Sequence, residues 1–195
     1  MRFRKRKSND LFELPEKAKK IHSLEVILPD YNISDYGTEF LKFENLKELY
    51  VQSHAHMENL LPQEIGDLVL LEKLYILNFN YKEFPNWIFK LKNIKQLMLR
   101  GNNVDYIPKQ IKELSALEKL RIENCKLADL PDSIANLNNL RELSLSANSK
   151  LIKLNIDNLP NNLKILNLAV TGIIGQHLKE IELKCPHLKI NRFVN

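Results

Sequence analysis

The chain has 195 residues, 44% of them hydrophobic, which suits one domain or one repeat array with a sizeable buried core. Eight prolines and only five glycines exclude a linker-like composition. No stretch of about 18 consecutive apolar residues occurs, so the sequence predicts no membrane-spanning helix. The basic start lacks a following apolar region, which argues against a cleaved secretory signal. We therefore expect a cytoplasmic location, with delivery as an effector left open.

The formal net charge of +5 comes from the amino terminus. The basic residues there are Arg2, Arg4, Lys5, Arg6 and Lys7. Subtracting these five from the 29 basic residues leaves 24, which equals the 24 acidic residues. The body is therefore balanced and predicts no basic nucleic-acid surface. The segment itself is a candidate contact for nucleic acid, anionic membrane or a nuclear import receptor, and the alternative is a solubilising tail or an edge strand.

A repeat of 23 to 25 residues fills the chain from Ile21 onward. Its first positions are Ile21, Leu46, Leu71, Ile94, Leu117, Leu140, Leu163 and Leu188. The fourth and sixth positions are also apolar and alternate with polar residues, which is the period of a strand buried on one face. Asn191, at the expected fourth position of the last copy, breaks this rule. Strands at a fixed interval are expected to stack in parallel into one sheet.

Proline marks the second half of the central repeats. Pro85, Pro108 and Pro131 each precede apolar residues at i+3 and i+6, which suits a short helical turn with proline near its first position. These turns are wider than strands, so the stack should bend with the sheet on its concave side. We expect residues 71–162 to be regular and the ends less so.

This pattern resembles the leucine-rich-repeat family over about residues 11–195, most clearly at Leu97, Leu99, Asn102, Ile107 and Pro108. The resemblance implies an α/β solenoid, a horseshoe with a concave parallel β-sheet and short helical or 3-10 segments on the convex side. About seven or eight repeats would occupy residues 21–195, the last one incomplete. Residues 1–20 would hold the basic segment and a degenerate capping repeat. The resemblance also implies a protein-binding module that is not an enzyme and needs no cofactor.

The ninth repeat position departs from the family pattern, which places there an asparagine that bonds to loop backbone. The residues found are Pro29, His54, Phe79, Asn102, Cys125, Asn148 and Thr171. Phe79 cannot make such bonds, so Asn78 or Asn80 is the candidate replacement.

The sequence places few reactive side chains in recognisable catalytic or metal-binding patterns. No phosphate-binding glycine motif, H-E-x-x-H or C-x-x-C occurs. Cys125 and Cys185 are expected on different faces and more than two turns apart, beyond the reach of a disulfide. The run Cys185-Pro186-His187 reads as a structural thiol rather than a catalytic pair. The one metal-like cluster, His54 and His56 with Glu58, lacks a fourth ligand, and a solvated loop is the alternative.

Strand residues at the third, fifth and seventh positions should point out from the concave face. The candidate protein-binding residues there are Tyr50, Lys73, Tyr75, Leu77, Met98, Arg100, Lys119, Arg121 and Glu123. Neighbouring strands are about 4.8 Å apart, so Tyr50, Tyr75 and Met98 should form an exposed ladder. Tyrosine and arginine often dominate interface energy. The alternative is that the aromatic side chains only stabilise the sheet.

A second apolar contact patch is expected near the end of the chain. Its predicted members are Ile165, Val170, Ile190 and Val194. The sequence stops inside a repeat, which leaves two alternatives. In one, the chain is the substrate-recognition domain of a larger effector or signalling enzyme. In the other, this end packs on another molecule, including by self-association.

Overall fold

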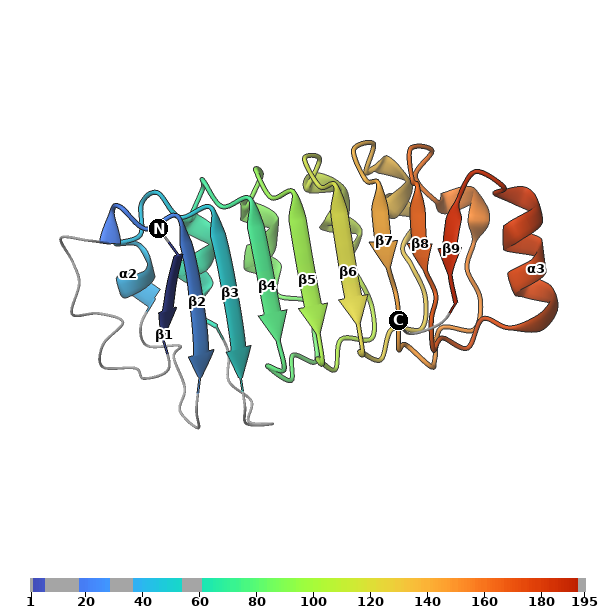
Figure 1. The fold of residues 1–195 in the computed structure, drawn as a ribbon, viewed down its shortest axis with the longest axis horizontal. Coiled ribbons are helices and arrows are strands. Elements are labelled where there is room, and N and C mark those ends of the chain that lie inside the picture. The colour runs from blue at the N-terminus through green and yellow to red at the C-terminus, as the bar shows by residue number, and fades with distance from the viewer. Residues whose placement is uncertain (1, 6–17, 29–36, 54–60, 193–195) are drawn as a thin grey trace.

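A computed structural model describes residues 2–5, 18–28, 37–53 and 61–192. These residues contain a sheet of nine strands that lie side by side in chain order (Figure 1). The strands are β1 (Arg2–Lys5), β2 (Ser23–Leu28), β3 (Glu48–Ser53), β4 (Lys73–Leu77), β5 (Gln96–Arg100), β6 (Lys119–Glu123), β7 (Glu142–Ser144), β8 (Ile165–Asn167) and β9 (Lys189–Asn191). Each pairs in parallel with the next, which confirms the predicted stack.

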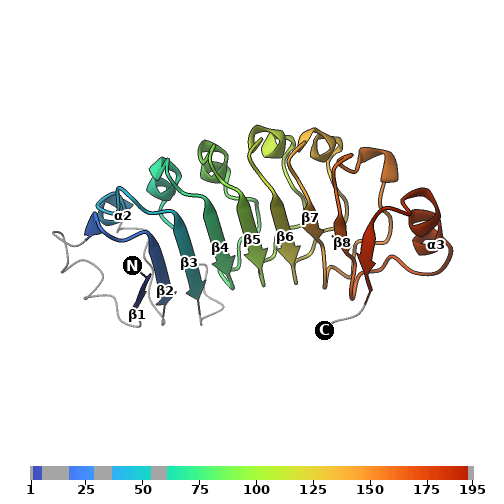
Figure 2. The ribbon, with the colours of Figure 1, turned by 45° about the horizontal axis from the view of Figure 1, so that its top comes forward.

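Short helical segments connect the strands on one side of the sheet. They are α2 (Gly37–Phe40), the 3-10 turns η2 (Gln63–Asp67), η3 (Asn86–Lys90), η4 (Lys109–Glu113), η5 (Asp132–Asn136) and η6 (Ile156–Asn158), and α3 (Gly175–Lys184). Figure 2 shows these segments along the outer side of a bent array, with the sheet on the inner side. The predicted horseshoe, with a concave sheet and convex 3-10 turns, is confirmed.

Proline sets the start of four 3-10 turns. Pro62, Pro85, Pro108 and Pro131 each occupy the N-cap in an extended conformation. For Pro85, Pro108 and Pro131 this is one residue before the helical position that the sequence suggested. Their missing N–H groups are not needed there. The Pro85 carbonyl accepts the first bond of η3, from the amide of Ile88 at 3.1 Å.

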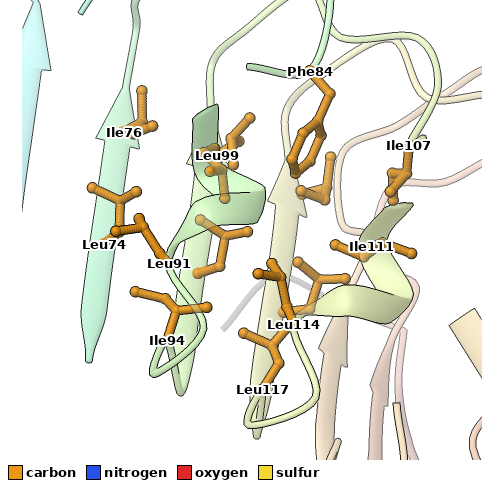
Figure 3. Packing of buried hydrophobic residues seen from close by; sticks show 14 of the residues in the cluster. Leu74, Ile76, Phe84, Leu91, Ile94, Leu99, Ile107, Ile111, Leu114 and Leu117 are labelled. Carbon is orange, nitrogen blue, oxygen red and sulfur yellow. The ribbon is translucent and has the colours of Figure 1, made fainter. Parts of the chain in front are cut away.

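One hydrophobic core runs between the sheet and the convex turns. Figure 3 shows Leu74 and Ile76 of β4 and Leu99 of β5 in one cluster with Leu91, which directly follows η3, and Ile111 of η4. All five side chains are at most 1% exposed. Full burial of a leucine or isoleucine stabilises a fold by about 1.5 to 3 kcal/mol. Since these side chains come from different repeats, the core forms only when neighbouring repeats stack.

Two buried asparagines tie the turns together. The Asn148 side chain donates to the carbonyls of Ile122 at 2.7 Å and Leu145 at 2.9 Å, and it accepts from the Leu127 amide at 3.1 Å. Asn102 occupies the equivalent place in its own repeat and bonds to Ile76, Arg100 and Tyr81. Each asparagine therefore fixes backbone groups from two neighbouring turns.

Phe79 fills the same interior place with an aromatic ring. It is 0% exposed, and its centroid lies 6.3 Å from that of Tyr81. Within the described residues, the side chains of Asn78 and Asn80 do not bond to loop backbone, so the expected replacement by an asparagine is wrong. Both instead adopt positive φ angles, of 60° and 59°. Phe79 therefore replaces the hydrogen bonds of the asparagine with apolar contact.

A second set of asparagines lies outside the core and was not anticipated. Each precedes the first position of a repeat and donates to a carbonyl of the preceding turn at 2.8 to 3.0 Å. These residues are Asn45, Asn93, Asn139 and Asn162. They are exposed, so water competes for the same groups.

The two ends depart from the regular pattern. Residues Arg2–Lys5 form edge strand β1, which confirms the edge-strand alternative for that part of the basic segment. Arg6, Lys7 and the expected capping repeat before residue 18 lie outside the described residues, and the boundary at residue 20 stays a prediction.

The last strand is placed one residue earlier than the sequence suggested. Ile190 pairs with the inward residue Leu166 and packs against the core, so its predicted outward position is wrong. A shift of one residue exchanges the faces of a strand. This register turns a partly buried isoleucine towards the core instead of the amide of Asn191, whose burial without full hydrogen bonding is costly. The apparent exception at Asn191 is thereby removed.

We expect the Asn148→Ala variant to lose about 2 to 4 kcal/mol of unfolding free energy, because buried backbone groups then lack partners. Asn139→Ala is the matched control. It removes one exposed bond, to the Ser115 carbonyl, and we expect it to cost less than about 1 kcal/mol. Equilibrium urea unfolding of both variants measures these losses. Equal losses would contradict a structural role specific to Asn148.

Candidate functional site

The concave face brings the predicted binding residues together in three rows. Pairing places Tyr50, Tyr75, Met98 and Arg121 in one row. Leu77, Arg100 and Glu123 form a second row. Lys73 and Lys119 lie in the third, with Gln96 between them. Arg100 is exposed and the other eight predicted residues are partly exposed. The sequence therefore located all nine on one surface, while their role in binding stays a prediction.

An apolar ladder, defined as Tyr50, Tyr75, Leu77 and Met98, occupies the face over β3 to β5. The two tyrosine rings are tilted by 42°, with centroids 6.2 Å apart. The Tyr50 hydroxyl donates to Gln52 at 2.9 Å, and the Tyr75 hydroxyl donates to Gln96 at 3.0 Å. Partial burial, and secondarily the charge of Glu48, raises the pKa of Tyr75. The ladder thus presents fixed aromatic rings.

Charged side chains surround the ladder and mostly pair across strands. Lys73 lies 3.6 Å from the Glu48 carboxylate. Arg121 donates through Nε to Glu142 at 2.9 Å, and Lys119 lies 3.3 Å from the same carboxylate. Burial opposes ionisation of Glu142, but the bonds and charges of Arg121 and Lys119 outweigh it and lower its pKa. These pairs form a polar rim with little net charge.

Arg100 differs from its neighbours. It ends β5, between Leu77 and Glu123 in the pairing. The Glu123 carboxylate accepts a hydrogen bond from the Ser144 hydroxyl at 2.6 Å, on the side away from β5. Among the described residues, no ion pair or side-chain hydrogen bond involves the Arg100 guanidinium. Its donors are therefore available at the border of the apolar ladder.

The predicted second apolar patch is not assembled as expected. Ile165 is partly exposed on β8, and Val170 is 59% exposed in the following loop. Ile190 packs on the core, and Val194 lies outside the described residues. Ile174 and Leu183, at the start and near the end of α3, are 74% and 81% exposed. Sequence reasoning missed them because it extended the repeat through a segment that forms a helix of ten residues.

The structure offers little for metal or thiol chemistry in the part that it describes. There, no three His, Cys, Asp or Glu side chains group as metal ligands. The candidate cluster at His54, His56 and Glu58 lies outside this part. Both cysteines are free thiols, and burial raises the pKa of Cys125 to about 11 and also raises that of Cys185. Both thiols are therefore poor nucleophiles at neutral pH.

No described helix has the length and apolar character required to cross a bilayer.

Comparisons with known proteins agree on the architecture. No family model and no curated protein matches the sequence. A leucine-rich-repeat protein of Leptospira interrogans is similar, at 24% identity and TM-score 0.68. The match covers 97% of this chain and 47% of the Leptospira chain. The leucine-rich-repeat domain of the type III effector XopL is also similar, at 19% identity and TM-score 0.66. The match covers 95% of this chain and 72% of the XopL domain.

A third similar structure is the ectodomain of the Arabidopsis thaliana receptor kinase GASSHO1/SCHENGEN3, in complex with Casparian strip integrity factor 2. It shares 19% identity at TM-score 0.56, over 90% of this chain and 21% of its own. This chain thus spans less than half of the Leptospira protein and of the ectodomain. The molecule is a solenoid built on one parallel sheet. Specifically, it has the leucine-rich-repeat fold.

Glu142 should make stability depend on pH. Its pKa is lowered in the fold, so its contribution is present above its ordinary value of 4.5 and is lost as the pH falls through the lower folded value. We expect the Glu142→Gln variant to be less stable than wild type at neutral pH, and the gap to shrink on acidification. Urea unfolding across this range measures the gap. A constant gap would show that ionisation of Glu142 contributes nothing.

Proposed function

We propose that this protein is a recognition module that binds a partner protein on its concave face, rather than a catalyst. The observation that supports this most is the apolar ladder. Its four side chains are partly exposed, lie on neighbouring strands, and are not part of the core between the sheet and the turns. Large aromatic and sulfur-containing side chains bury much area on contact, and such residues often carry interface energy.

The ladder is also preorganised. The hydrogen bonds from the two tyrosine hydroxyls to Gln52 and Gln96 hold the rings before a partner arrives. Binding then loses less side-chain entropy than it would with mobile rings. These contacts also serve the alternative in which the aromatics only stabilise the sheet, so a binding experiment must separate the two roles.

The charged rim of the concave face supports binding that discriminates between partner proteins. The pairs Lys73–Glu48 and Lys119–Glu142 border the apolar ladder. A partner must match these charges or displace them, and mismatched charges at an interface cost affinity. Recognition by shape and charge together is what this arrangement offers.

A second proposal is that the module recognises substrates or targets for a larger effector or signalling enzyme. Its support is the likeness to the XopL domain, which is part of an effector. The third alternative, binding of nucleic acid or anionic membrane through the basic amino terminus, has weaker support. The backbone of Arg2–Lys5 is paired with β2 and does not form a free tail.

The test uses matched tyrosine variants. Partners crosslinked to the wild-type protein in its source cell are identified by mass spectrometry, and their affinities are measured by calorimetry. We expect Tyr75→Ala to weaken binding by more than about 1 kcal/mol while leaving the protein folded. The control is Tyr106→Ala, which removes a tyrosine that is 50% exposed outside the sheet.

The control should change affinity by less than about 0.5 kcal/mol. Equal affinities of both variants for every partner would reject the concave face as the binding surface. Circular dichroism of Tyr75→Ala detects the other role of the ring, because a ring needed only for sheet stability lowers the melting temperature without a separate loss of affinity.

A further inference from the structure

Charged side chains on the concave face over β6 and β7 are engaged in bonds within the protein. Glu142 is held by Lys119 and Arg121, and the Glu123 carboxylate accepts from Ser144. On the other side of the ladder, Lys73 pairs with Glu48. A partner gains little from contacting charges that are already paired, because it must first replace an existing interaction.

Arg100 is a cation beside the ladder for which the described part of the chain shows no ion pair. Its nearest acidic neighbour in the pairing, Glu123, is bonded towards β7 instead. A guanidinium has five N–H donors in a planar fork, which matches the two oxygens of a carboxylate. Its other pairing neighbour is Leu77, so the charge borders apolar surface where water competes less for it.

The spacing around Arg100 adds a second constraint. Met98 lies two residues earlier on β5 and on the same face. Residues i and i+2 of any extended segment also share a face, at about 6.6 Å. A partner segment with an acidic residue two positions from a large apolar residue therefore presents both groups at the separation of Arg100 and Met98.

We infer that the concave face selects a protein segment in which Asp or Glu lies two positions from a large apolar residue. The carboxylate binds Arg100, and the apolar side chain packs on Met98 and Tyr75. This inference rests on the proposed function and adds the chemistry of the partner. A nucleic acid fits less well, because Lys73, Lys119 and Arg121 are already paired with carboxylates and do not extend a row of cations for successive phosphates.

The experiment selects random linear peptides displayed on phage against three proteins. These are the wild type, the charge reversal Arg100→Glu, and the control Lys112→Glu, which makes the same change of charge on the convex turn η4. We expect wild type and control to enrich peptides with Asp or Glu two positions from a large apolar residue. Arg100→Glu should lose these peptides and enrich Lys or Arg in their place.

Affinities of the best wild-type peptide, measured by fluorescence anisotropy, should fall about tenfold or more in Arg100→Glu and stay within about twofold in Lys112→Glu. The loss should shrink at high salt, since screening weakens an exposed charge pair. A labelled single-stranded oligonucleotide is the competing probe. Oligonucleotide binding that Arg100→Glu abolishes, with no peptide enriched, would replace the peptide assignment and overturn the inference.

Other outcomes separate this inference from the proposed function. Peptides that bind wild type and Arg100→Glu equally but lose affinity in Tyr75→Ala overturn the role of Arg100 and leave concave-face binding intact. Peptides that are insensitive to both variants bind elsewhere and count against both. Absence of any enriched peptide on the wild type overturns the inference, because a linear segment then does not suffice as ligand.

Discussion

The structure depends on burial of leucine and isoleucine between successive turns. Leu74 and Leu97 lie on neighbouring strands, and both are at most 1% exposed because turns on either side cover them. A single turn has no second layer of its own, so its apolar residues are buried only when the next turn is in register. The register in turn sets which side chains face out. The concave surface is therefore a consequence of core packing.

Hydrogen bonds from buried asparagine side chains fix the loop that follows a strand, which apolar packing alone does not do. Asn102 and Asn148 bond to carbonyls and amides of two turns, whereas Phe79 fills the equivalent place with a buried ring. The asparagines hold the loop by directional hydrogen bonds, whereas Phe79 contributes apolar packing. Both fill the same interior position with a buried side chain, and β4 keeps its parallel register with β5 beside Phe79.

Much of this architecture is readable from the sequence, because the leucine spacing is periodic and the period alone determines which residues become neighbours. Tyr50, Tyr75 and Met98 share a row for that reason. The prediction was wrong at Ile190, because the period was extended through a segment where ten residues form α3 and the strand then starts one residue earlier. The leucine period does not predict contacts that occur in only one repeat. Nothing in the spacing tells that Arg121 is held by Glu142 while Arg100 is not, since that depends on side-chain rotamers and competing acceptors.

Strands in this sheet pair only with their immediate neighbours, so local opening at one end does not break the pairing in the centre. The ladder and Arg100 lie on β3 to β5, away from both termini of the row. Loss of the outermost turn at β9 exposes one interface and leaves the pairing of β3 with β4 and β5 untouched. The proposed recognition surface is thus insulated from fraying at the ends, and a change in the turn at β9 leaves the side chains that β3 to β5 present in place.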